Sequence, residues 1–174
     1  MLPRSLPVDS PRLDLEGEFA AYLTATAQFA LSDWVLRVAN LPAFRADPEL
    51  DLERLRGEIA PLFEAIVDAI LVHDPVYDDE PGTRIAEAAG RHGDQRRKID
   101  IPIGTLLTEL HELRQVITRA MSGWAETAGR HPALASLTLR LERAIDTASI
   151  AAATSWVAGT APSRDGRHGS GTTE

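Results

Sequence analysis

The chain of 174 residues contains no cysteine. This absence excludes disulfide bonds, thiolate metal sites and a cysteine nucleophile. It also fits a reducing compartment. The N-terminal residues lack the apolar stretch of a secretory signal. We therefore expect a cytoplasmic protein.

Basic charge is scarce. Lys98 is the only lysine. The chain has 18 Lys and Arg residues and 26 Asp and Glu residues, which gives a formal net charge of −8. Nucleic-acid binding needs a basic patch, so this balance disfavours a nucleic-acid partner. The most apolar run, residues 59–72, is about one helix long and contains Glu64 and Asp68, so it is too short and too charged to cross a bilayer. We expect no membrane partner.

The usual signatures of catalysis are also missing. The five histidines form no H-E-x-x-H motif, and there is neither a nucleophile elbow nor a glycine-rich phosphate loop in a strand–loop–helix setting. We expect no metal site, no cofactor and no enzymatic activity. One alternative stays open: a haem or another small ligand could bind near a histidine on an inner helix face, with His92 and His73 as candidates.

The periodicity of apolar residues predicts helices throughout, without strand-like alternation of useful length. Gly57 and Pro61 predict a break between two helical pieces, because proline inside a helix removes a hydrogen bond. The expected class is all-α, a single bundle of five or six helices. We expect a flexible lead at 1–13, a helical domain at 14–158 and a disordered tail at 159–174. The predicted helices are 14–38, 51–59, 60–72, 82–98, 103–128 and 132–157, with a loop at 42–50.

One stretch combines a helical seam with polar groups. Apolar residues recur at spacings of three and four from Ile103 to Trp124, which is typical of an amphipathic helix. Arg114 lies about 60° from the centre of this seam, and Glu109 borders it. His92 and Arg96 share the inner face of the preceding helix. If these helices pack antiparallel, all four polar residues form one cluster, serving either as a structural ion-pair network or as a pocket for a polar ligand.

The last predicted helix is apolar on two sides. One stripe includes Ile145, Ala148 and Ala152, and a second includes Leu139, Ile150, Ala153 and Val157. Burial on two sides is expected where a second copy of the chain packs against such a helix. We expect a homodimer whose interface includes Ile145, Ala148, Ala152 and Trp156.

Two motifs carry a resemblance to a known family. Residues 91–97 read RHGDQRR, and residues 106–114 follow the pattern L-L-x-E-L-x-x-L-R. Together they resemble the N-terminal input domain of RsbRD-type stressosome proteins, which also occurs at the front of some bacterial sensor histidine kinases. The resemblance implies an all-helical, globin-like sensory module without haem, normally dimeric and coupled through its last helix to an output domain.

Only about seventeen residues follow Val157. We therefore expect a freestanding signal-input domain of bacterial stress or two-component signalling that acts through protein–protein interaction. Its expected partners, besides a second copy, are a kinase, a STAS protein or an anti-sigma factor. The alternative is a haem or small-ligand sensor that uses the cluster of His92, Arg96 and Arg114.

Overall fold

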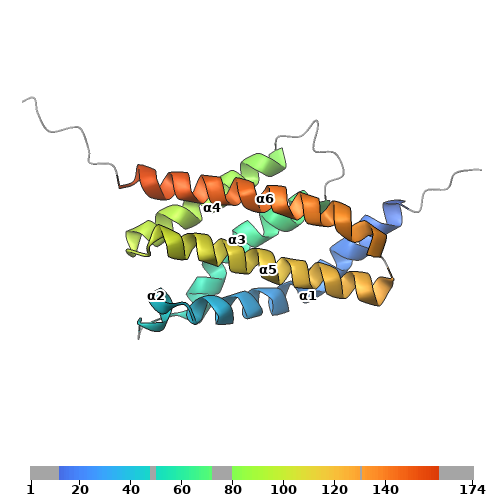
Figure 1. Cartoon of the computed structure of the whole chain (residues 1–174), viewed down its shortest axis with the longest axis horizontal. Helices are drawn as coiled ribbons and strands as arrows, with labels where there is room; N and C mark the ends of the chain where they lie inside the picture. Colours follow the sequence, from blue (N-terminus) through green and yellow to red (C-terminus); the bar gives the residue numbers. More distant parts are fainter. Residues whose placement is uncertain (1–11, 48–49, 72–79, 130, 161–174) are drawn as a thin grey trace, which may run out of the picture.

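The computed structural model describes residues 12–47, 50–71, 80–129 and 131–160. These residues form six helices and no strand (Figure 1). The prediction of an all-α bundle of five or six helices is confirmed. The helices are α1 (Arg12–Ala39), α2 (Pro42–Arg45), α3 (Leu52–Leu71), α4 (Glu80–Lys98), α5 (Ile103–Ala128) and α6 (His131–Ala158).

α5 lies between α6 and α1 in the view of Figure 1, and α3 and α4 cross behind these three long helices. α4 packs most extensively along α6 and also against α3. It meets α5 only briefly, close to the turn that joins them. The condition considered for the polar cluster, antiparallel packing of these two helices along their length, is therefore not met, although their ends do approach each other.

The core is built on the predicted seam of α5. The large apolar residues of the seam from Leu106 to Trp124 are buried, and the ring of Trp124 lies 4.9 Å from that of Phe19 in α1, measured between centroids. Gly129 ends the helix as its C-cap, with a left-handed φ of 66° that glycine adopts without strain. The buried residues of the seam are Leu106, Leu110, Leu113, Ile117, Met121 and Trp124.

The predicted break in α3 is wrong. The helix continues from Leu52 to Leu71 with Pro61 inside it. Pro61 and Gly57 are both exposed, so water can hydrate the Gly57 carbonyl that proline leaves without an amide partner. The opposite face buries a continuous row of apolar residues that holds the helix together across the proline. That row is Leu55, Ile59, Leu62, Phe63, Ile66 and Ile70.

A short helix occupies the predicted loop after α1. α2 begins at Pro42, which is favourable in a first turn, and buries Phe44.

Further along the chain, α4 and α6 approach very closely at Gly93. A Cβ atom built on Gly93 would lie 2.2 Å from the carbonyl oxygen of Ala152. Glycine is needed at this crossing because its missing side chain lets the two backbones touch.

The predicted domain limits lie partly beyond the described residues. Most of the expected lead, residues 1–11, and most of the expected tail, residues 161–174, lie outside them. The described core runs from α1 to the end of α6. In the part of the chain that the structure describes, no helix has both the length and the apolar character needed to cross a membrane.

Candidate functional site

Three of the four predicted polar residues meet in the interior. The Arg96 Nε atom of α4 donates to both carboxylate oxygens of Glu109 of α5, at 3.1 and 2.9 Å. The His92 Nε2 atom lies 3.2 Å from the same carboxylate. All three side chains are essentially inaccessible to solvent. The structure therefore brings three of the four residues together where the end of α4 approaches the start of α5.

A fourth member comes from α3. The Arg96 Nη1 atom forms a short ion pair with Glu58, whose side chain is 21% exposed. We call His92, Arg96, Glu109 and Glu58 the charge cluster. One guanidinium thus bridges two carboxylates, one fully buried and one at the surface. Such an arrangement fixes a buried arginine because its fork of donors matches carboxylate oxygens.

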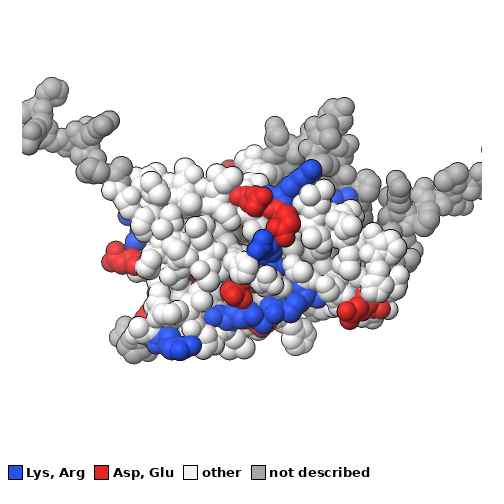
Figure 2. Space-filling model, in the orientation of Figure 1, with Lys and Arg blue, Asp and Glu red and all other residues white. Residues whose placement is uncertain are grey.

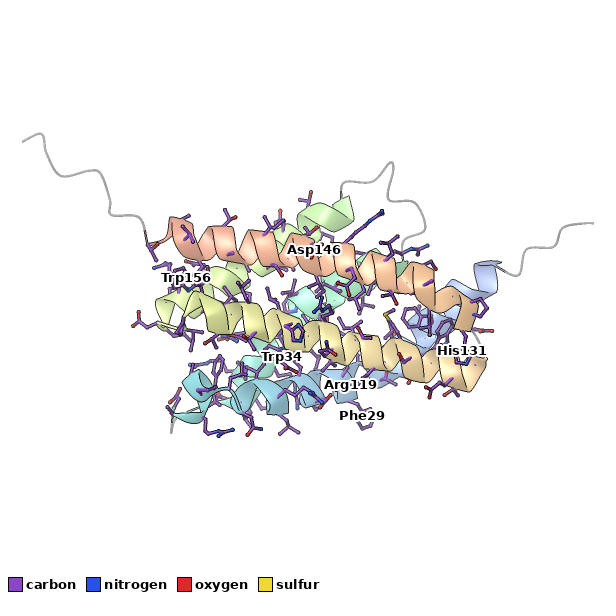
Figure 3. The ribbon with its side chains drawn as sticks, viewed as in Figure 1. Phe29, Trp34, Arg119, His131, Asp146 and Trp156 are labelled. Carbon is purple, nitrogen blue, oxygen red and sulfur yellow. The ribbon has the colours of Figure 1, made fainter. Side chains whose placement is uncertain are left out.

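Two aromatic side chains close around the cluster. The Arg96 guanidinium carbon lies 5.5 Å from the ring centroid of Phe44, a distance typical of a cation–π contact. The Trp34 Nε1 atom donates to the backbone carbonyl of Glu109 at 2.9 Å and so ties α1 to α5 (Figure 3). Every long helix except α6 therefore contributes a residue to this site.

The hydrogen bonding inside the cluster is incomplete. Among the described residues, the Arg96 Nη2 atom and both ring nitrogens of His92 are buried without a hydrogen-bond partner. The His92 Nε2 atom lies within ion-pair distance of the Glu109 carboxylate, but the contact does not have the direction of a hydrogen bond. Buried polar atoms without partners are costly, so these atoms are the places where a small polar molecule would be favoured.

Arg114 does not join the charge cluster. Its Nη1 atom pairs with Glu142 of α6 at 3.0 Å and its Nη2 atom lies 2.8 Å from the Nδ1 atom of His111. The Arg114 side chain is 31% exposed. The predicted inward position is wrong because a long side chain that starts at the border of the seam reaches past the apolar contact to water.

A hollow of about 340 Å³ adjoins the charge cluster. Arg96 and Glu58 line it on the side of the cluster, and Phe44 and Leu55 contribute apolar surface. Asp47, Asp51 and Arg54 add charges of both signs at the rim. A small molecule with an apolar body and polar groups would fit this lining.

The side chains predicted for a dimer interface contact other residues of the same chain. Ile145, Ala148 and Ala152 are buried against the protein's own core. Trp156 is half-buried and its Nε1 atom donates to the Ile101 carbonyl at 3.0 Å. Contacts within one chain therefore account for the burial of these side chains, and the homodimer stays a prediction.

Of the two histidines considered as ligands of a haem or another small molecule, the structure describes only His92. His73 lies outside the described residues. His92 faces the Glu109 carboxylate, as above. In the part of the chain that the structure covers, no group of three or more His, Asp or Glu side chains is arranged to hold a metal ion.

The helical bundle and the motifs of α4 and α5 agree with the class of domain that the sequence resembles. The family model of the RsbT co-antagonist protein rsbRD N-terminal domain matches residues 30–167, which is most of the chain and includes the whole charge cluster. The protein belongs to this family. Comparisons with curated proteins and with solved structures gave no match.

Proposed function

We propose that this chain is a cytoplasmic input domain of stressosome-type signalling that works by binding other proteins and not by catalysis. The observation that carries the proposal is the family match over residues 30–167. The partners that fit such a role are a kinase, a STAS protein or an anti-sigma factor of a bacterial stress or two-component pathway.

The distribution of surface residues supports a role in protein binding. Phe29 and Leu36 lie two helical turns apart on α1 and are 77% and 60% exposed. Figure 3 shows Phe29 projecting away from the bundle. Exposed apolar side chains grouped on one helix face are typical of protein interaction sites. The charge cluster supports the same role, because it joins α3, α4 and α5. A bound partner could change the relative position of these helices through it.

Binding to defined partners tests the proposal. The purified chain is mixed in turn with the STAS, kinase and anti-sigma proteins encoded beside its gene, and complex formation is measured by sedimentation velocity. We expect a complex with at least one of them, weakened by Phe29→Ser and Leu36→Ser. The matched control is Thr24→Ala, an exposed change on α1. No complex with any of the three proteins would overturn the proposal.

A second function, small-ligand sensing, is favoured by the hollow beside Arg96. The buried Nη2 atom without a partner and the apolar lining suit a compact molecule that carries a hydrogen-bond acceptor. Ligation of haem by His92 is less favoured, since its Nε2 atom faces Glu109. A thermal-shift screen of small polar molecules tests this function. A true ligand raises the melting temperature of the native chain but not that of Leu50→Trp, which fills the hollow.

A further inference from the structure

The hollow beside the charge cluster lies where three parts of the chain meet. α2, the first turns of α3 and the turn between α4 and α5 all contribute to its walls. In Figure 1, α2 lies at the same end of the bundle as that turn. The volume of about 340 Å³ suits a small molecule, and much of the wall is apolar. The apolar residues of the lining are Ala43, Phe44, Ala46, Leu50, Leu55, Ile99 and Ile101.

Arg96 supplies an unused hydrogen-bond donor to this hollow. Its side chain is buried and forms part of the lining. The Nε atom donates to Glu109 and the Nη1 atom pairs with Glu58. The Nη2 atom has no hydrogen-bond partner in the part of the chain that the structure describes. A buried N–H group without a partner is costly, so a ligand oxygen that accepts from Nη2 stabilises the site.

Glu58 supplies an unused acceptor in the same ion pair. Its Oε2 atom takes the short contact with Arg96. Its Oε1 atom lies 3.6 Å from the Nε atom of Arg54, which is too long for a hydrogen bond. Oε1 can therefore accept from an N–H group of a ligand. The Arg96–Glu58 ion pair thus offers the hollow one donor and one acceptor.

The charge of the lining opposes an anionic ligand. Among the described residues, three carboxylates and two guanidinium groups line the hollow, and both guanidinium groups already contact Glu58. A ligand carboxylate would therefore meet an excess of like charge. The charged residues of the lining are Asp47, Asp51, Arg54, Glu58 and Arg96.

The wider surface does not favour an anion either. On the face shown in Figure 2, acidic and basic side chains are interspersed and form no basic field. The formal net charge of the chain is −8. Electrostatic attraction at long range therefore favours neutral and cationic molecules over anions.

We propose that the hollow binds a small uncharged molecule with an amide edge, in which a carbonyl oxygen lies beside an N–H group. The carbonyl accepts from Arg96 Nη2, the N–H group donates to Glu58 Oε1, and a short apolar body packs against Phe44 and Leu55. Primary carboxamides and lactam rings share this edge. A carboxylate of the same shape offers acceptors only and brings a like charge to Glu58. The proposal deepens the second proposed function, small-ligand sensing, and rests on it.

Two molecules of the same shape test the class of ligand. Isobutyramide and isobutyrate share a carbon skeleton and differ only in the amide and the carboxylate. Each is titrated into the isotope-labelled full chain, and backbone amide signals are followed by nuclear magnetic resonance. Isobutyramide should cause saturable shift changes at Phe44, Leu55 and Ile101, and isobutyrate should bind at least about tenfold more weakly. Pyrrolidinone is the lactam arm of the same titration, and the tighter of the two amides shows whether the source is linear or cyclic.

Glu58 should set this preference. Glu58→Ala removes the acceptor and leaves Arg96 Nη1 open to a ligand, so this variant should bind isobutyrate more tightly than isobutyramide. A merely structural role of Glu58 would weaken the binding of both molecules alike. Glu58→Gln keeps the size of the side chain and serves where Glu58→Ala does not fold. It should lower the preference for the amide because the like charge is gone. The matched control is Glu64→Ala, an exposed change on α3 outside the lining, which should keep the native preference.

Leu50→Trp tests the location, because its side chain fills the hollow and should abolish the shift changes caused by isobutyramide. Equal affinity for the amide and the carboxylate, shift changes away from the hollow, or no binding of either amide would each overturn the proposal. An anion that the thermal-shift screen finds as a ligand of the hollow would also overturn it, but would leave the second proposed function standing. A screen in which no molecule binds would remove both.

Discussion

Arg96 and Glu109 are partners in a fully buried ion pair. The pair joins the last turns of α4 to the first turns of α5, with two contacts from a single Nε atom. The Arg96 Nη1 atom extends the same guanidinium to Glu58 at the surface. A buried charge is tolerated only where its partner stays in place, so the two helices are held in one relative position.

We predict that Arg96→Met strongly destabilises the protein. Methionine fills much of the volume, but Glu109 is left as a buried carboxylate without a cation. The expected loss in the free energy of unfolding is about 3–5 kcal/mol. Urea denaturation followed by far-ultraviolet circular dichroism measures it.

The control for Arg96→Met is Arg114→Met. Arg114 pairs with Glu142 at a half-exposed site, so its loss should cost no more than about 1 kcal/mol. The double variant R96M/E109L removes both buried charges and should recover part of the stability lost by Arg96→Met. Equal losses for Arg96→Met and Arg114→Met would show that the cluster is not a buried network.

Gly93→Ala should destabilise the crossing of α4 and α6. The new methyl group would lie 2.2 Å from the Ala152 carbonyl oxygen, and only backbone movement can relieve that contact. The expected loss is about 3 kcal/mol or more. Gly57→Ala is the control, because no atom lies within 4 Å of a Cβ there. It should stabilise the exposed interior of α3 by about 0.5–1 kcal/mol. Similar stabilities of the two variants would contradict the close approach.

The pKa of Asp94 should be low. Hydrogen bonds from Lys98 at 2.6 Å and Arg97 at 2.8 Å hold the pKa of this carboxyl below its ordinary value of 3.8. Because the folded pKa is depressed, the stabilisation is complete above the ordinary value and is lost as the pH falls through the folded one. A nuclear magnetic resonance titration of the side chain measures the pKa.

Variants of Lys98 provide the comparison for Asp94. Lys98→Gln removes the larger cause and should raise the pKa of Asp94 toward its ordinary value, whereas Lys98→Arg keeps a cation and should leave it low. An Asp94 pKa that is the same in the native chain and in Lys98→Gln would refute the assignment.

Patterns within a single helix were predictable from sequence. The spacing of Leu106, Leu110 and Leu113 predicts their shared burial, since a helix of fixed period brings them to one face. His92 and Arg96, four residues apart, follow the same rule. Gly129 predicts the end of α5 because glycine readily adopts the left-handed conformation at a C-cap.

Contacts between distant elements were not predictable in this way. Glu58 reaches Arg96 across 38 positions of sequence, and no local pattern marks it as the second carboxylate. Phe44 belongs to a helix of four residues, too short for a periodic signal. Arg114 starts near the seam, and only the position of Glu142 in α6 decides where its long side chain ends.

Pro61 shows how tertiary packing can override a local signal, and it gives a last prediction. The apolar face of α3 holds the helix together although Pro61 lacks the amide hydrogen that would bond to the Gly57 carbonyl. Pro61→Ala supplies this bond at an exposed position and should raise the free energy of unfolding by about 1–3 kcal/mol. Pro42→Ala, at the first turn of α2 where proline is favourable, should give no such gain. If Pro61→Ala leaves the stability unchanged or lowers it, α3 is bent at the proline in a way that the alanine helix cannot reproduce, and the packing of its two halves against α4 and α1 depends on that bend.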